Sequence, residues 1–180
     1  MNLLALDFIN TSWCITHSPY MDTLKEPERL TAFLKKRDLL PDSAADAGAV
    51  ESLLRLRDFL TDALLQVIET QALSEAAQKE LNRYFSLSSL VRVLDKTENE
   101  PSVSLQPLTK DWNWVQSEIS ASFAHLAIQE KERLRVCENP ECRWYFHDET
   151  RNRNKRCCDE TCASLVKVRR YRARQKKEQK

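Results

Sequence analysis

Five of the six cysteines in this 180-residue chain lie between positions 137 and 162. Cys137, Cys142, Cys157 and Cys162 follow the pattern C-x4-C-x14-C-x4-C. Zinc binds four thiolates at the corners of a tetrahedron, and two close pairs joined by a loop of this length can supply them. Buried or disulfide-bonded cysteines are the alternative, but a reducing compartment and paired spacing favour a metal. The pattern therefore predicts a structural Zn²⁺ site.

Two further residues compete for places in that site. Cys158 stands next to Cys157, and a C-x3-C pair with Cys162 is sterically possible. The matched x4 spacing favours Cys157 as the ligand and leaves Cys158 as a spare thiol. His147 could supply a nitrogen ligand, but four cysteines already complete a structural site.

A strongly basic segment follows the cysteines. Residues 131–180 contain 16 Lys and Arg against 8 Asp and Glu, and residues 167–180 alone carry a net charge of +7. A charge run often forms only a solvated helix face, but here a metal-fixed platform leads directly into it. We expect this segment to form a helix that binds nucleic acid, DNA in the first place, with structured RNA as the alternative. The candidate contact residues are Arg151, Arg153, Lys155, Arg156, Lys167, Arg169, Arg170, Arg172 and Arg174. Leu165, Val168 and Tyr171 are expected to pack this helix onto the zinc module.

The rest of the chain differs in charge and composition. Residues 1–130 contain 12 Lys and Arg against 19 Asp and Glu, a net charge of −7. The whole chain has a single glycine, which excludes the glycine-rich loops of Rossmann and P-loop proteins. With 42% apolar residues it can bury a core, yet no apolar run is long enough to span a bilayer. We expect a cytoplasmic protein without a membrane partner, divided into domains at residues 1–130 and 131–180.

Hydrophobic periodicity predicts a mainly α fold for residues 1–130. Apolar residues recur at steps of three and four over 50–68 and 112–126, and shorter helices are expected at 3–15, 28–40 and 75–85. Residues 91–93 and 103–105 alternate instead, as in a β-hairpin with a longer loop. The expected architecture is a helical N-terminal domain with a small hairpin, a small four-cysteine zinc module and a basic C-terminal helix.

The segment RVCENPECRWYFHDETRNRNKRCCDETCASLVKVRRYRAR, residues 135–174, resembles the bacterial CGNR zinc fingers. The opening LALDFINT, residues 4–11, is similar to the start of the ABATE domain that precedes this finger in transcription regulators. One departure is that Cys162-Ala163-Ser164-Leu165 replaces the Cys-Gly-Asn-Arg tetrapeptide. The resemblance implies a DNA-binding regulator whose residues 1–130 sense a signal or form a homodimer. It also implies Cys157 rather than Cys158 as the ligand.

Asp7, Asn10 and Thr11 lie in the matching N-terminal segment. They are candidates for a pocket that binds a small-molecule effector, and the alternative is that they cap or brace the first helix. An enzyme is not expected. Its best case would be Cys14 with His17 as nucleophile and base, but no orienting group or oxyanion site accompanies them.

Overall fold

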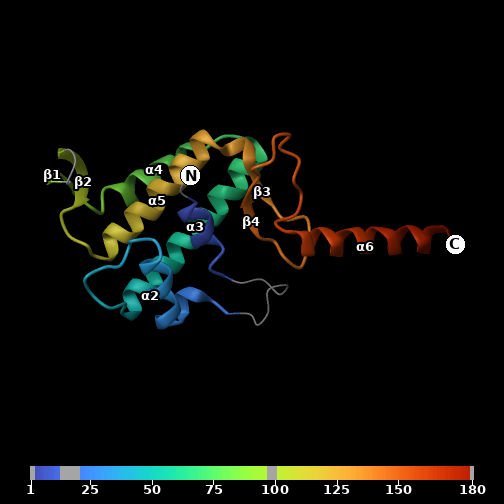
Figure 1. The fold of residues 1–180 in the computed structure, drawn as a ribbon, viewed down its shortest axis with the longest axis horizontal. Coiled ribbons are helices and arrows are strands. Elements are labelled where there is room, and N and C mark those ends of the chain that lie inside the picture. Colours follow the sequence, from blue (N-terminus) through green and yellow to red (C-terminus); the bar gives the residue numbers. More distant parts are fainter. Residues whose placement is uncertain (1–2, 13–20, 97–100, 179–180) are drawn as a thin grey trace.

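The computed structural model describes residues 3–12, 21–96 and 101–178. The described chain is mainly helical with one small antiparallel hairpin in the N-terminal part, as the sequence predicted, and it has a second small hairpin that was not predicted (Figure 1). The helices are α1 (Leu4–Ile9), α2 (Pro27–Lys35), α3 (Ala47–Thr70), α4 (Glu75–Phe85), α5 (Trp112–Gln129) and α6 (Glu160–Glu178). The strands are β1 (Leu90–Lys96), β2 (Pro101–Pro107), β3 (Leu134–Val136) and β4 (Tyr145–His147). Short 3-10 turns lie at Thr23–Lys25 and Lys131–Arg133.

Side-chain caps fix where three of the helices begin. Asp46, Ser74 and Asp111 accept hydrogen bonds from backbone N–H groups three residues ahead, in the first turns of α3, α4 and α5. These bonds satisfy N–H groups that have no partner within the helix.

Two predicted helices are shorter than expected. Helix α1 ends at Ile9, and beyond it Ser12 forms a β-bridge with Asp22, so the expected helix to residue 15 does not extend that far. Helix α2 ends at Lys35, because Asp38 adopts a left-handed conformation with φ 55°. The N–H of Leu39 then bonds back to Leu34, which closes the turn well before Pro41.

The helices pack around one apolar core. Its fully buried side chains include Leu56 and Leu60 of α3 and Ile119 and Phe123 of α5, with Phe8 from α1. The residues of α3 and α5 belong to the stripes that the helical period predicted, so burial of one face per helix drives this packing. Within the described residues, no helix is long and apolar enough to cross a membrane.

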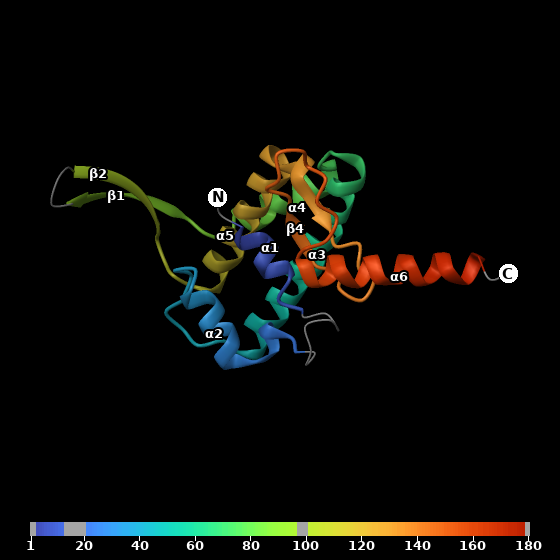
Figure 2. The ribbon, with the colours of Figure 1, turned by 45° about the vertical axis from the view of Figure 1, so that its right-hand side comes forward.

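The hairpin of β1 and β2 projects from the helical body (Figure 2). Its register pairs Leu94 with Val103 and Arg92 with Leu105. Most of its apolar side chains are exposed, and Leu94 and Val103 are each 67% exposed. We refer to residues 90–96 and 101–108 as the apolar arm.

Residues 131–178 form the C-terminal module, which consists of the β3–β4 hairpin, a long loop and α6. The module docks on the helical domain through Leu134, which is completely buried in the helical core. Helix α6 leaves the body at the end opposite the apolar arm and extends into solvent (Figures 1 and 2).

Candidate metal centre and nucleic-acid interface

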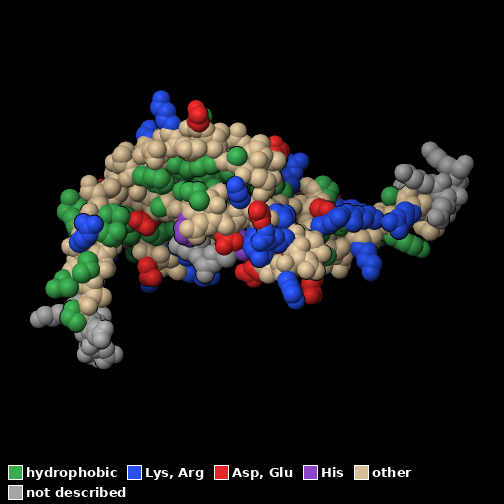
Figure 3. Space-filling model, turned by 90° about the horizontal axis from the view of Figure 1, so that it is seen from above, with side chains coloured by type: hydrophobic (Ala, Val, Ile, Leu, Met, Phe, Trp, Pro, Cys, Tyr) green, Lys and Arg blue, Asp and Glu red, His purple; other side chains and the backbone are tan. Residues whose placement is uncertain are grey.

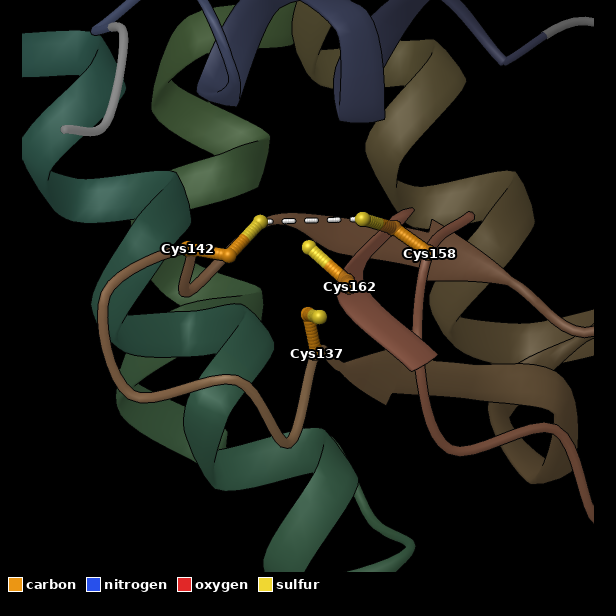
Figure 4. Close-up of side chains that lie close together, drawn as sticks. All are labelled: Cys137, Cys142, Cys158 and Cys162. Carbon is orange, nitrogen blue, oxygen red and sulfur yellow. Dashed lines mark hydrogen bonds between the residues drawn. The ribbon is translucent and has the colours of Figure 1, made fainter. Parts of the chain in front are cut away.

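Four cysteine sulfurs meet where the β3–β4 hairpin approaches the start of α6. They belong to Cys137, Cys142, Cys158 and Cys162, and all lie within 4.8 Å of one another. The sulfur atoms point toward a common centre, and those of Cys142 and Cys158 are 3.6 Å apart (Figure 4). Three of these four side chains are buried, so a metal bound there would be shielded from solvent.

This sulfur cluster fits zinc. A zinc ion about 2.3 Å from each of four sulfurs in a tetrahedron separates neighbouring sulfurs by about 3.8 Å, close to the spacing found. Four thiolates and no other ligand type form a closed structural site rather than an open catalytic one. The sulfur cluster therefore supports Zn²⁺ as the cofactor of this chain, as the sequence predicted.

The clustered cysteines differ at one position from the ligand set that the C-x4-C spacing favoured. The structure places Cys158, not Cys157, in the cluster, and Cys157 lies beside it, buried next to Cys137. The reason is the start of α6. The Asp159 carboxylate accepts a hydrogen bond of 2.7 Å from the N–H of Cys162 and caps the helix. Cys158 precedes this cap directly, and the bend over residues 157–159 turns it toward Cys162 in the first turn.

The protonation of the cluster depends on its hydrogen bonds and its crowding. Burial by itself would raise the pKa of Cys137, but hydrogen bonds from the backbone N–H groups of Cys158 and Asn139 lower it below the usual range. Burial raises the pKa of Cys158, and the neighbouring Cys142 and Cys137 raise it further. Because close thiolates repel one another, a bound divalent cation would relieve this crowding.

Asn139 connects the sulfur cluster to the basic helix. Its side chain is fully buried, and its Nδ2 lies 3.3 Å from the Sγ of Cys162. Its Oδ1 accepts a hydrogen bond of 2.7 Å from Arg169 of α6. Sequence reasoning did not single out Asn139, although an Asn-Pro pair between two cysteines is a turn signal that could have indicated it.

Asp148 shapes the basic loop, which comprises residues 151–156. Its fully buried carboxylate accepts hydrogen bonds from the N–H and Oγ of Thr150 and from the N–H of Lys155. Burial alone would raise the pKa of Asp148, but these bonds lower it, so the carboxylate is ionised at neutral pH. The Asp-x-Thr spacing is typical of an Asx turn. The loop is therefore held by one buried acid.

The nine predicted nucleic-acid contacts are all in the module, but they differ in how they are held. Arg153 and Arg156 of the loop pair with Glu132 and Glu138. On α6, Arg169 pairs with Glu141 at 2.6 Å, and Arg170 pairs with Glu138 at 2.7 Å. Lys155 lies over the ring of Phe146. Within the described residues, the remaining four of the nine have no ion pair, and they are Arg151, Lys167, Arg172 and Arg174.

The packing predicted for α6 is wrong in detail. Leu165, Val168 and Tyr171 were expected to face the zinc module, but all three are exposed. Val166 packs against the sulfur cluster in their place. Only the first turns of α6 touch the module, so the helix extends with Lys and Arg side chains along it (Figure 3).

Asp7, Asn10 and Thr11 all contact protein partners. Asp7 pairs with Arg37, and Thr11 donates to the carbonyl of Phe8 and accepts from the buried Arg57. Asn10 bonds to both backbone groups of Tyr145 in β4, at 2.8 Å and 3.0 Å. These contacts agree with the alternative interpretation that the three residues brace the first helix. The small-molecule pocket stays a prediction. Cys14 and His17 lie outside the described residues.

Comparison with known proteins matches two successive parts of the chain to two families. The family described as "Putative stress-induced transcription regulator", ABATE, matches residues 2–129, and the CGNR zinc finger matches residues 133–175. No curated protein matches the chain. Neither family is described as an enzyme family. The first match covers well over half of the sequence, and the second contains the sulfur cluster and most of α6. The chain therefore belongs to the ABATE family and carries a CGNR zinc finger at its C-terminal end.

Proposed function

We propose that this protein is a zinc-dependent DNA-binding regulator of transcription. The ligands are Cys137, Cys142, Cys158 and Cys162. The zinc site would hold the base of α6, while the basic loop and the projecting part of α6 contact the duplex. The observation that carries this proposal is a helix with exposed Lys167, Arg172 and Arg174. The first turns of this helix are anchored at the buried sulfur cluster and by the ion pairs of Arg169 and Arg170. Because thiolates must stay reduced to hold zinc, the proposal places the protein in the cytoplasm.

Zinc content and DNA affinity, measured on the same samples, test this function. The full chain should purify with one zinc ion, bind duplex DNA, and lose both properties when the metal is removed by a strong chelator. Affinity should fall with rising salt, since phosphate contacts release counterions. A metal-free chain that still bound DNA tightly would contradict the proposal. So would a clear preference for structured RNA over duplex DNA at matched salt, which would favour the RNA-binding alternative.

We further propose that the helical domain joins two copies of this chain through the apolar arm. A two-stranded hairpin is only marginally stable by itself in water, and this one exposes six large apolar side chains. They are Leu90, Val91, Leu94, Val103, Leu105 and Leu108. Apart from Arg92, the charged residues between positions 90 and 108 all fall within positions 95–100 and comprise one lysine and three acids, so this surface suits another apolar surface and not a polyanion. A second copy supplies a matching arm, and pairing there leaves α6 of each copy free.

Leu94→Glu tests the dimer, with Ile128→Glu as the matched control because Ile128 is 66% exposed on α5. Sedimentation should show a dimer for the native chain and for Ile128→Glu, and a monomer for Leu94→Glu. A native chain that stays monomeric at micromolar concentration would contradict the dimer and leave DNA binding untouched.

A further inference from the structure

A groove of about 1020 Å³ runs between α6 and the segment 154–160. Cations line both of its walls. Lys155 and Arg156 come from the basic loop, and Lys167, Arg170 and Arg174 come from α6. The three α6 cations are spaced i, i+3 and i+7, so they lie on one face of the helix. A row of positive charge on each wall matches a polyanionic strand running along the groove.

The groove also holds an acid that both walls contact. The Glu138 carboxylate pairs with arginines from opposite sides, since Arg170 of α6 lies 2.7 Å from its Oε2 and Arg156 of the loop lies 3.3 Å from its Oε1. The backbone N–H of Glu138 also donates to the carbonyl of Arg156 at 2.9 Å, which fixes the loop wall. Two guanidinium groups that converge on one oxyanion form the arrangement with which proteins hold phosphate.

The other acids of the groove are confined to one end. Asp159 and Glu160 lie at the start of α6, where Asp159 serves as the helix cap. Lys167, Arg170 and Arg174 lie one turn or more further along the helix. The positive part of the groove is therefore its far end, and Glu138 is the acid that reaches the cations there.

We propose that this groove seats the phosphate backbone of one DNA strand, and that Glu138 stands in for a phosphate when DNA is absent. The inference rests on the proposed function and identifies the surface that carries it. In the free protein Arg156 and Arg170 pair with Glu138, and in the complex they pair with a DNA phosphate. Glu138 thereby weakens binding, because the incoming phosphate must displace or repel a carboxylate.

Glu138→Gln and Glu141→Gln form a matched pair that tests the groove. Both substitutions remove one acid from the loop between Cys137 and Cys142, and both break one ion pair of an α6 arginine. The arginine affected by Glu141→Gln is Arg169, which keeps its hydrogen bond to Asn139 and does not line the groove. With the zinc-loaded full chain and a labelled duplex of about 20 base pairs, we expect Glu138→Gln to bind roughly five- to tenfold more tightly. Glu141→Gln should change the affinity less than twofold.

A second pair of variants tests the groove without altering the cysteine loop. Lys167→Gln combined with Arg174→Gln should weaken binding and reduce the salt slope by nearly two, since each lost phosphate contact removes about 0.9. Arg143→Gln, an exposed cation of the same module outside the groove, should leave the slope unchanged. If Glu138→Gln loses zinc, these variants still test whether the groove binds the phosphate backbone.

The outcomes separate the two proposals. Suppose that the native chain binds DNA, that Glu138→Gln and Glu141→Gln have equal affinities, and that the double variant of Lys167 and Arg174 binds as tightly as the native chain. The groove then does not bind the phosphate backbone. DNA binding by another surface would then stand. If the native zinc-loaded chain fails to bind DNA at all, the proposed function itself is wrong.

Discussion

The two regions of this molecule are stabilised by different chemistry. The helical domain buries a large apolar core across α1, α3 and α5, whereas the core of the C-terminal module is made chiefly of cysteines and Phe146. A module of this size with so few aliphatic side chains buries too little apolar surface to stay folded by itself. The comparison indicates that apolar burial stabilises the helical domain and that metal binding stabilises the C-terminal module.

Metal removal is the largest expected effect and separates the two regions most sharply. Structural zinc contributes on the order of 10 kcal/mol to the folding of small zinc modules. A chelator should therefore abolish amide protection around Cys137, Cys142 and Phe146 while Leu56 and Leu60 stay protected. Hydrogen exchange read by mass spectrometry measures both regions in one sample. Unchanged protection of the module after complete loss of zinc would show that its fold does not depend on the metal.

Serine substitutions at the adjacent cysteines sharpen the same comparison. Cys158→Ser removes a sulfur from the cluster and should lower the zinc content to well below one ion per chain. Cys157→Ser alters a buried thiol beside the cluster and should keep the zinc. Elemental analysis of the purified proteins gives the result directly. If Cys157→Ser loses zinc and Cys158→Ser keeps it, Cys157 is the fourth ligand, as the C-x4-C spacing favoured.

That assignment shows where sequence reasoning succeeds and where it stops. Helix α3 and helix α5 follow from the spacing of their apolar residues, because one buried face per helix leaves a visible period. The spacing of the cysteines likewise predicts a zinc site. The choice between Cys157 and Cys158 depends on the bend before α6 and its cap at Asp159, a local geometry that residue counting cannot see.

For the charged residues, too, the sequence predicts where they cluster but not how they pair. The sequence predicts a cationic surface in residues 151–174 because the cations cluster there. It does not show that Glu138 and Glu141, close in sequence to Cys137 and Cys142, pair with Arg170 and Arg169 across the fold. Such pairs join residues about 30 positions apart, so only the tertiary structure separates anchoring cations from those available to a ligand.

A core substitution in the helical domain should have the converse effect of chelation. Leu60 is completely buried, and Leu60→Ala should lower the free energy of unfolding by about 2–5 kcal/mol through lost burial and a cavity. The zinc content should not change, because Leu60 lies outside the sulfur cluster. Urea unfolding followed by circular dichroism measures the loss, and Leu40→Ala, at a position 44% exposed, serves as the control. Equal effects at both positions would contradict the core described for this domain.

The smallest effect concerns the contact that joins the two regions. Asn10 bonds to both backbone groups of Tyr145, so its side-chain amide pairs with β4 as the backbone of a neighbouring strand would. Asn10→Asp keeps an acceptor for the Tyr145 N–H but places a second oxygen against the Tyr145 carbonyl. We expect a loss of about 1–2 kcal/mol, the cost of an unpaired and partly buried polar group, and faster exchange of the Tyr145 amide. Asn113→Asp, at an exposed position on α5, should change neither. If Asn10→Asp leaves that exchange rate unaltered, the two regions are coupled by the apolar contacts of Leu134 and Tyr145 without this hydrogen-bonded link.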